Sequence, residues 1–198
     1  MNDIRYYVDL SINFECSDNI VRFMDKFLKI NKLGVISTQS INEKWDSIIL
    51  RVKNKDYVIN GRHSNYPHLT YVDTEFYSHE KVSSCDIIVV TNFLESKPLL
   101  QKLSGKNLGF EVLISKLKYM KSDEIGKWFW DVKYLSDLCR KHNQQLILSS
   151  GARDIFELVS LRTFNSILAK LNISPSEYWS DLNIWLNSRL RGGFIDFN

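Results

Sequence analysis

Basic side chains near the ends of predicted strands are the residues of this chain best suited to binding phosphate groups. Arginine can pair a phosphate through two parallel hydrogen bonds, and a helix N-terminus adds a favourable dipole beside Arg162. Arg140 and Lys141 end a predicted helix, so they have a second explanation, since cations complement the C-terminal helix dipole. The candidates for phosphate or RNA binding are Arg153, Arg162, Lys116, Lys118, Arg140 and Lys141. Of these, we expect Arg153 and Arg162 to contribute most.

A run of small residues, Ser149-Ser150-Gly151-Ala152, immediately precedes Arg153 and follows the apolar run 146–148. Functional groups collect at the carboxyl ends of strands in α/β folds, so this position is informative. Small residues let a strand turn sharply and let its backbone approach another group closely. A serine nucleophile would need a histidine and an acid beside it, and no particular pair can be assigned. We interpret Ser149, Ser150, Gly151 and Ala152 as a structural turn.

A metal site is the main enzymatic alternative, and the first predicted strand is where it would lie. Metal-dependent phosphoesterases on barrels of strands and helices often carry Asp-x-His-x-His there, with alternate histidines reaching one face as ligands. The corresponding segment here is Asp9-Leu10-Ser11-Ile12-Asn13, in which poor zinc ligands replace both histidines. His63 and His68 flank a loop-like segment, while His79 and His142 stand alone. The sequence predicts no metal site and no cofactor bound by this chain.

Charge and cysteine content restrict the broad class of the protein. The 198 residues carry a formal net charge of +3, too small to indicate nucleic-acid binding by itself. Lys102–Lys121 holds five lysines and one acid, which fits either a solvated surface or a phosphate-facing patch. The three cysteines are far apart and form no CxxC pair, which indicates a reducing compartment. Because there is no apolar run of about 18 residues, we expect a cytoplasmic protein that does not enter a membrane.

Short apolar segments alternate with helical patterns along most of the chain. A strand at 146–148 is expected to lie parallel to strands at 108–112 and 87–90, with a helix at 125–139 packed outside the sheet. The alternation lapses between residues 47 and 72. We therefore predict one domain, residues 1–198, of the α/β class. Its expected form is a single TIM-like (β/α) barrel, trimmed or distorted, with mostly parallel strands and helices outside.

The region around the small-residue turn resembles ribonuclease P protein component 3, the archaeal counterpart of the thirty-kilodalton subunit of eukaryotic RNase P. The resemblance lies in Ser149-Ser150-Gly151-Ala152, in Glu157-Leu158, in Ser160 and Arg162, and upstream in Gly109-Phe110-Glu111-Val112. With the start of the chain it spans nearly the whole length, through short motifs. The chain departs from the family pattern at Val159, Leu161 and Thr163.

The resemblance implies a TIM-like fold and a role in tRNA 5′ maturation. In that family the RNA subunit carries the active site and uses magnesium, and the ribonucleoprotein removes the 5′ leader from precursor tRNA by endonucleolytic hydrolysis. The implied partners are ribonuclease P RNA, protein component 2 and other protein subunits, with precursor tRNA as the substrate of the assembly. This chain would not be catalytic alone.

Two alternatives stay open at the level of sequence. One is a metal-dependent, phosphoesterase-like hydrolase on the same barrel, and the other is a protein-binding domain without an RNA role. Aromatic residues do not decide between them. Trp128 and Phe129 fall on an apolar helical face and are expected in the core, whereas Trp130 lies off that face, where it suits contact with RNA or with a partner protein.

Overall fold

Seven parallel strands form the centre of the protein in the computed structural model, which describes residues 6–36, 46–53, 67–74 and 85–190. Each strand pairs in parallel with the next one along the chain. The strands are β1 (Val8–Ile12), β2 (Lys32–Ile36), β3 (Ile48–Lys53), β4 (His68–Asp73), β5 (Ile87–Val89), β6 (Gly109–Leu113) and β7 (Gln145–Ser149). The predicted parallel pairing of the strands at 87–90, 108–112 and 146–148 is therefore confirmed.

The sheet curls until its first and last strands meet at one end. An isolated parallel bridge joins Ile12 to Ala152, and the backbone N–H of Asn13 donates to the carbonyl of Ala152 at 2.8 Å. The result is a nearly closed barrel of seven strands, one fewer than in a complete (β/α)8 barrel. This confirms the prediction of a trimmed TIM-like α/β fold.

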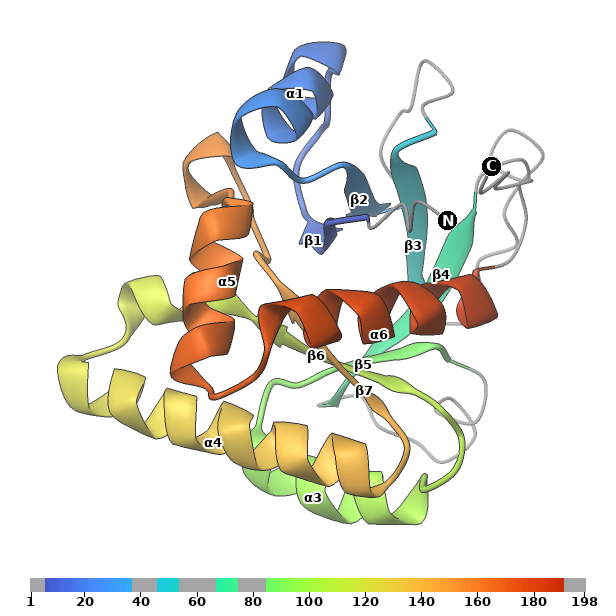
Figure 1. Ribbon diagram of the computed structural model, residues 1–198, viewed down its shortest axis with the longest axis vertical. Coiled ribbons are helices and arrows are strands. Elements are labelled where there is room, and N and C mark those ends of the chain that lie inside the picture. The colour runs from blue at the N-terminus through green and yellow to red at the C-terminus, as the bar shows by residue number, and fades with distance from the viewer. Residues whose placement is uncertain (1–5, 37–45, 54–66, 75–84, 191–198) are drawn as a thin grey trace.

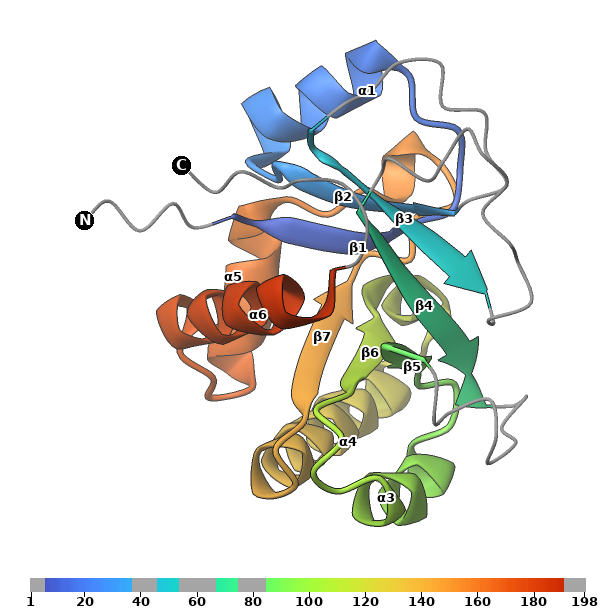
Figure 2. The same ribbon diagram turned by 90° about the vertical axis from the view of Figure 1, so that its right-hand side faces the viewer.

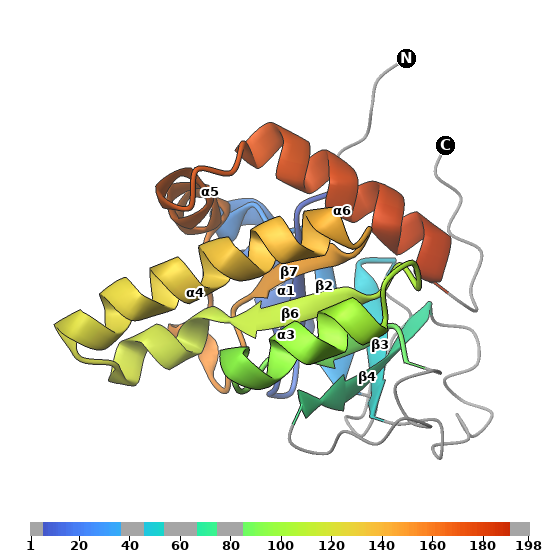
Figure 3. The same cartoon turned by 90° about the horizontal axis from the view of Figure 1, so that it is seen from below.

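Helices cover the outside of the barrel (Figure 1). They are α1 (Asp18–Phe23), which continues as the π-helix η1 (Met24–Leu28), then α3 (Phe93–Lys102), α4 (Ser122–Lys141), α5 (Leu161–Lys170) and α6 (Pro175–Arg189). Two short 3-10 helices, η3 (Ile114–Tyr119) and η4 (Ile155–Glu157), follow β6 and β7. Helices α3 and α4 lie side by side (Figure 3). None of the helices that the structure describes is long and apolar enough to cross a membrane.

Helix α4 shows how the sequence pattern determines packing. Its buried residues recur every three or four positions, so they form one stripe that faces the sheet. Those residues are Trp128, Val132, Leu135 and Cys139. Trp130 lies off the stripe and is 73% exposed. The predictions that this helix packs outside the sheet and that Trp128 is in the core are confirmed.

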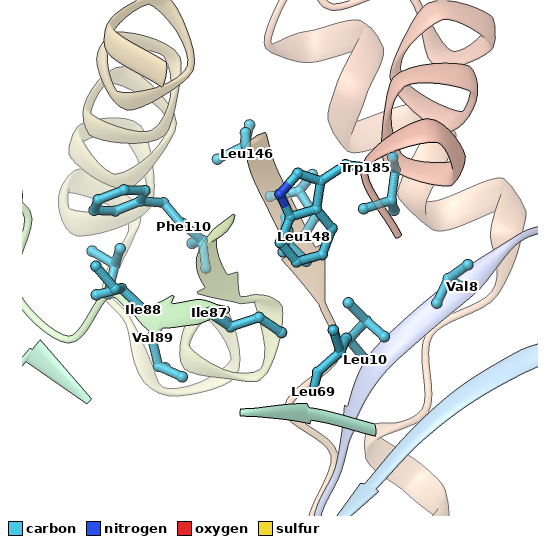
Figure 4. Close-up of a cluster of buried hydrophobic side chains, with 14 of the residues drawn as sticks. Val8, Leu10, Leu69, Ile87, Ile88, Val89, Phe110, Leu146, Leu148 and Trp185 are labelled. Carbon is cyan, nitrogen blue, oxygen red and sulfur yellow. The ribbon is translucent and has the colours of Figure 1, made fainter. Parts of the chain in front are cut away.

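Helix α6 closes the amino-terminal end of the barrel, where β1 and β7 do not pair (Figure 2). The Tyr178 hydroxyl accepts from the backbone N–H of Leu148 at 2.7 Å, and Asn183 donates to the carbonyl of Tyr6, just before β1, at 2.8 Å. Trp185 donates to the carbonyl of Asn107, just before β6, at 3.0 Å. The side chain of Trp185 enters the buried cluster formed by residues of the strands (Figure 4). Thus α6 occupies part of the place that an eighth strand would fill.

Strand β1 approaches β2 unusually closely at Gly34. The pairing of the two strands shifts between Asp9 and Ile12, so an extra residue of β1 bulges at this point. A Cβ atom at Gly34 would lie 2.2 Å from the carbonyl oxygen of Leu10. Because that neighbour is backbone, only glycine fits here.

The three cysteines, Cys16, Cys85 and Cys139, are all buried, and none of them forms a disulfide. Burial raises the pKa of Cys16 to about 11 and that of Cys85 to about 12, and it also raises the pKa of Cys139. The thiolate is the reactive form, so we expect the native protein to react with Ellman's reagent at pH 8 far more slowly than the unfolded protein. Absorbance of the released thiol, with and without denaturant, measures this difference. Rapid labelling of the native protein would contradict the buried positions.

Candidate nucleic-acid interface and the buried polar centre

A fully buried ion pair spans the inside of the barrel. Arg51 of β3 meets Glu111 of β6 through two hydrogen bonds, Nη1 to Oε1 at 3.3 Å and Nη2 to Oε2 at 2.6 Å. Since β3 and β6 are not neighbours in the sheet, the pair must cross the interior. Two parallel N–H···O bonds fix the guanidinium and the carboxylate in one plane. The two side chains therefore hold each other in one fixed arrangement inside the barrel.

Two further side chains surround this pair. Ser149, the last residue of β7, donates its hydroxyl to Glu111 Oε1 at 2.6 Å. The ring of Tyr71 in β4 lies 4.4 Å from the Arg51 guanidinium carbon, a favourable cation–π distance. Four strands thus contribute one residue each to the centre. Both carboxylate oxygens of Glu111 are occupied by Arg51 and Ser149, so a cation at this carboxylate would have to displace them.

Asp9 of β1 is fully buried close to this centre. Its Oδ1 accepts from the backbone N–H of Ser150 at 2.9 Å and of Ser11 at 3.3 Å, whereas its Oδ2 accepts no hydrogen bond from the described residues. Burial raises the pKa of the Asp9 carboxyl to about 6, and the charge of Glu111 adds to the increase. The hydrogen bonds from Ser150 oppose it but are the weaker effect. Asp9 therefore joins the first strand to the turn after the last one.

The positions that would carry metal ligands in a phosphoesterase have other roles here. Ser11 donates its backbone N–H to Asp9, and the Asn13 amide lies at the limit of hydrogen-bond distance, 3.5 Å, from the Ser11 hydroxyl. His142 contacts Ser104 at the far end of α4. His63 and His79 lie outside the described residues. Within the described part of the chain, no group of three or more His, Cys, Asp or Glu side chains could hold a metal ion.

The turn after β7 is held by hydrogen bonds to the segment after β6 and within the turn itself. The carbonyl of Ser150 accepts from the N–H of Ser115 at 2.8 Å, and the hydroxyl of Ser150 accepts from the N–H of Ala152 at 3.1 Å. Gly151 has a φ of +68°, and a Cβ there would lie 2.8 Å from Ser115 Oγ. Glycine is thus required at 151 for conformation and for space. Ser150, Gly151 and Ala152 lie in the turn, whereas Ser149 is the last residue of β7.

Glu157 joins the two loops that follow β6 and β7. Its carboxylate accepts from the backbone N–H of Arg153 at 2.9 Å, from the Tyr119 hydroxyl at 3.1 Å and from Lys118 Nζ at 3.3 Å. The hydrogen bond from Arg153 is the main reason that the pKa of Glu157 is lowered, and those from Tyr119 and Lys118 add to it. Glu157 therefore holds Arg153 and Lys118 together at the carboxyl-terminal rim of the barrel.

The other candidate cations are distributed over several places. Lys116 also follows β6, where its Nζ donates to the carbonyls of Val90 and Thr91, both at 3.4 Å. Arg162 is exposed in the first turn of α5, in a groove that α5 forms with the end of η1. Arg140 pairs with Asp137 at 2.7 Å at the end of α4, and Lys141 is its exposed neighbour. Because α4 leads into the start of β7, Arg140 and Lys141 lie at the opposite end of the barrel from Arg153.

Sequence reasoning missed two features of this site. The first is the pairing of Arg51 with Glu111, which are 60 positions apart in the chain. The only local signal was a charged residue inside each of two apolar strands. The second is a pair of exposed rings on the rim, Tyr119 and Phe156, which belong to no helical or strand pattern.

The chain matches no protein-family model, and no curated protein matches it with significance.

Proposed function

We propose that this protein is a non-catalytic subunit of a ribonuclease P type of ribonucleoprotein, which supports a catalytic RNA during removal of the 5′ leader from precursor tRNA. The proposal includes a cytoplasmic location, a pairing with protein component 2 and contact with ribonuclease P RNA. Magnesium would be bound by the RNA. The proposal rests on the short motifs of the sequence together with one observation about the interior of the barrel and its carboxyl-terminal rim.

That observation is the contrast between the inside of the barrel and its rim. Inside, Glu111 is neutralised by Arg51 and bonded by Ser149, so both of its carboxylate oxygens already accept hydrogen bonds. On the rim, Glu157 pairs with Lys118 and accepts from the backbone N–H of Arg153, whose side chain is exposed. A rim that presents an exposed arginine around an internally neutralised centre suits phosphate binding better than hydrolysis. This contrast favours the RNA-supporting role over the phosphoesterase alternative.

Reconstitution tests the proposal. Cleavage of precursor tRNA by the cognate catalytic RNA and component 2, with and without this protein, is measured across a magnesium series. We expect the protein to lower the magnesium concentration required, because bound cations offset the repulsion between phosphates as the RNA compacts. If omission of the protein changes nothing at any magnesium concentration, the ribonuclease P proposal is wrong.

Paired charge removals test whether the two arginines that flank the turn after β7 and the start of α5 contact RNA. Arg153→Ala with Arg162→Ala is expected to reduce the stimulation and to lower the salt slope of RNA binding by about 2, roughly one per lost phosphate contact. Arg140→Ala with Lys141→Ala removes the same charge from exposed positions and is expected to leave both nearly unchanged. The alanine at 153 keeps the backbone N–H that binds Glu157, so circular dichroism should be unaltered. If only the Arg140→Ala, Lys141→Ala protein loses the stimulation, the RNA contact lies at the end of α4 instead.

A further inference from the structure

Two aromatic rings are exposed on the carboxyl-terminal rim of the barrel. Phe156 in η4 is 91% exposed, and Tyr119 at the end of η3 is 71% exposed. Ile155 is a third exposed apolar side chain beside them. Single exposed hydrophobic residues are common on proteins, but here the exposed rings come from two different loops that one carboxylate joins.

Hydrogen bonds hold the segments that carry these rings. The Asp154 side chain caps η4 by accepting from the N–H groups of Phe156 at 2.8 Å and Glu157 at 3.2 Å. Glu157 in turn accepts from the Tyr119 hydroxyl at 3.1 Å, which fixes the outer end of that ring. The rings are thus presented on an ordered frame. A ligand that stacks on them would find the loops already positioned, which lowers the entropic cost of binding.

Positive charge lies next to the rings. Lys118 Nζ is 5.7 Å from the centroid of the Tyr119 ring. Arg153 donates its backbone N–H to Glu157, and its side chain is exposed. Unpaired nucleic-acid strands are bound by this combination, in which bases stack on aromatic rings and phosphates meet Lys or Arg. Lys118 already pairs with Glu157, so an uncharged apolar partner would use the rings but would leave the exposed side chain of Arg153 without a counterpart.

We propose that Tyr119 and Phe156 form a stacking site for unpaired bases of an RNA strand whose phosphates meet Lys118 and Arg153. The inference deepens the proposed function and rests on its claim that the ligand is RNA. It narrows that claim to single-stranded segments, because the stacked bases of a duplex cannot lie on the rings.

Binding of a fluorescein-labelled oligouridylate of twelve nucleotides to the full chain, followed by fluorescence anisotropy, tests the inference. Phe156→Ala is expected to weaken binding by about fivefold to a hundredfold, the range for loss of one base stack. Phe156→Trp, which keeps a ring, should restore it. Tyr134→Ala is the matched control, because it removes an exposed aromatic ring of α4 that lies beside Lys97 of α3 and not on the loops after β6 and β7, and it should leave binding unchanged.

The same variants separate this inference from the proposed function. A blunt twelve-base-pair RNA duplex should bind Phe156→Ala and the unaltered protein alike. The stacking proposal is wrong if Phe156→Ala binds the oligouridylate as tightly as the unaltered protein does. It is also wrong if Phe156→Ala loses as much affinity for the duplex as for the oligouridylate. Loss of pairing with component 2 without loss of oligouridylate binding would instead make the rings a protein contact and would also overturn it. Failure of the reconstitution assay with stacking intact would reject only the ribonuclease P role.

Discussion

Replacing Arg51 by methionine is expected to lower the free energy of unfolding by about 3–5 kcal/mol, because it leaves a buried carboxylate without its partner. Glu111 is fully buried, and the guanidinium of Arg51 forms two of its three hydrogen bonds. Methionine fills much of the same volume, so the expected loss comes from the unpaired charge rather than from a cavity. Urea unfolding at pH 7, followed by tryptophan fluorescence, gives the difference in stability.

The matched control is the double variant Arg51→Met with Glu111→Gln. Its glutamine carbonyl can still accept from the Ser149 hydroxyl, while neither member of the pair carries a charge. Neutral replacements of buried ion pairs are often close to neutral in stability, so the double variant should regain more than half of the loss. Equal losses in the single and double variants would show that shape, and not charge, makes the centre stable.

Asp9 is expected to make the protein less stable as the pH rises from about 4 to about 6. Its pKa is raised to about 6 in the folded protein, from the ordinary value of 3.8, so the folded state binds the proton more tightly than the unfolded state. The stabilisation from this proton is present below the unfolded pKa and is lost as the pH passes the folded pKa. A shift of about 2 units corresponds to about 3 kcal/mol.

The variant Asp9→Asn isolates this effect from all other titrating groups. Asparagine keeps an oxygen that can accept from Ser150 and carries no charge at any pH. Between pH 4 and pH 7, the stability difference between the variant and the unaltered protein should shift in favour of the variant by about 3 kcal/mol. Urea unfolding at several pH values measures it. A difference that stays constant with pH would mean that Asp9 titrates normally in the folded protein.

The parts of the fold that could be predicted from the sequence depend on local patterns. The apolar stripe of α4 and the short apolar run of β7 each reflect one element facing the core, and the alternation of strands with helices implied parallel pairing. Ser174 and Glu177 form the Ser-x-x-Glu pattern typical of helix starts, and the Ser174 hydroxyl caps α6 by accepting from the Glu177 N–H at 3.5 Å. The predicted number of barrel strands was left open because closure is not a local property. It depends on the Ile12 to Ala152 bridge, 140 positions apart.

The candidate site was less predictable because its contacts are long-range. A residue type shows that Arg153 and Lys118 are cations, but only the tertiary structure shows that Glu157 joins them and that Arg140 lies at the other end of the barrel. Glu157 was noticed for its place in a short motif, and nothing local indicated its three hydrogen-bond donors. Arg51 lies within the apolar run 48–52, and that pattern predicts only a strand. A buried charge needs a partner from a distant segment, and the sequence does not name that partner.

The late position of helix α6 in the chain has a consequence for biosynthesis. All seven strands precede α6, yet Tyr178 supplies the acceptor for Leu148 of β7, and Asn183 donates to the carbonyl of Tyr6, two residues before β1. A ribosome delivers residues in order at about 5–20 per second, so β1 and β7 emerge before the helix that covers the space between them. During that interval β1 and β7 meet only at their carboxyl ends, so the rest of each strand is an open edge that is prone to pair with other chains. We therefore expect the nascent chain to be most prone to aggregation until α6 has emerged and packed between β1 and β7.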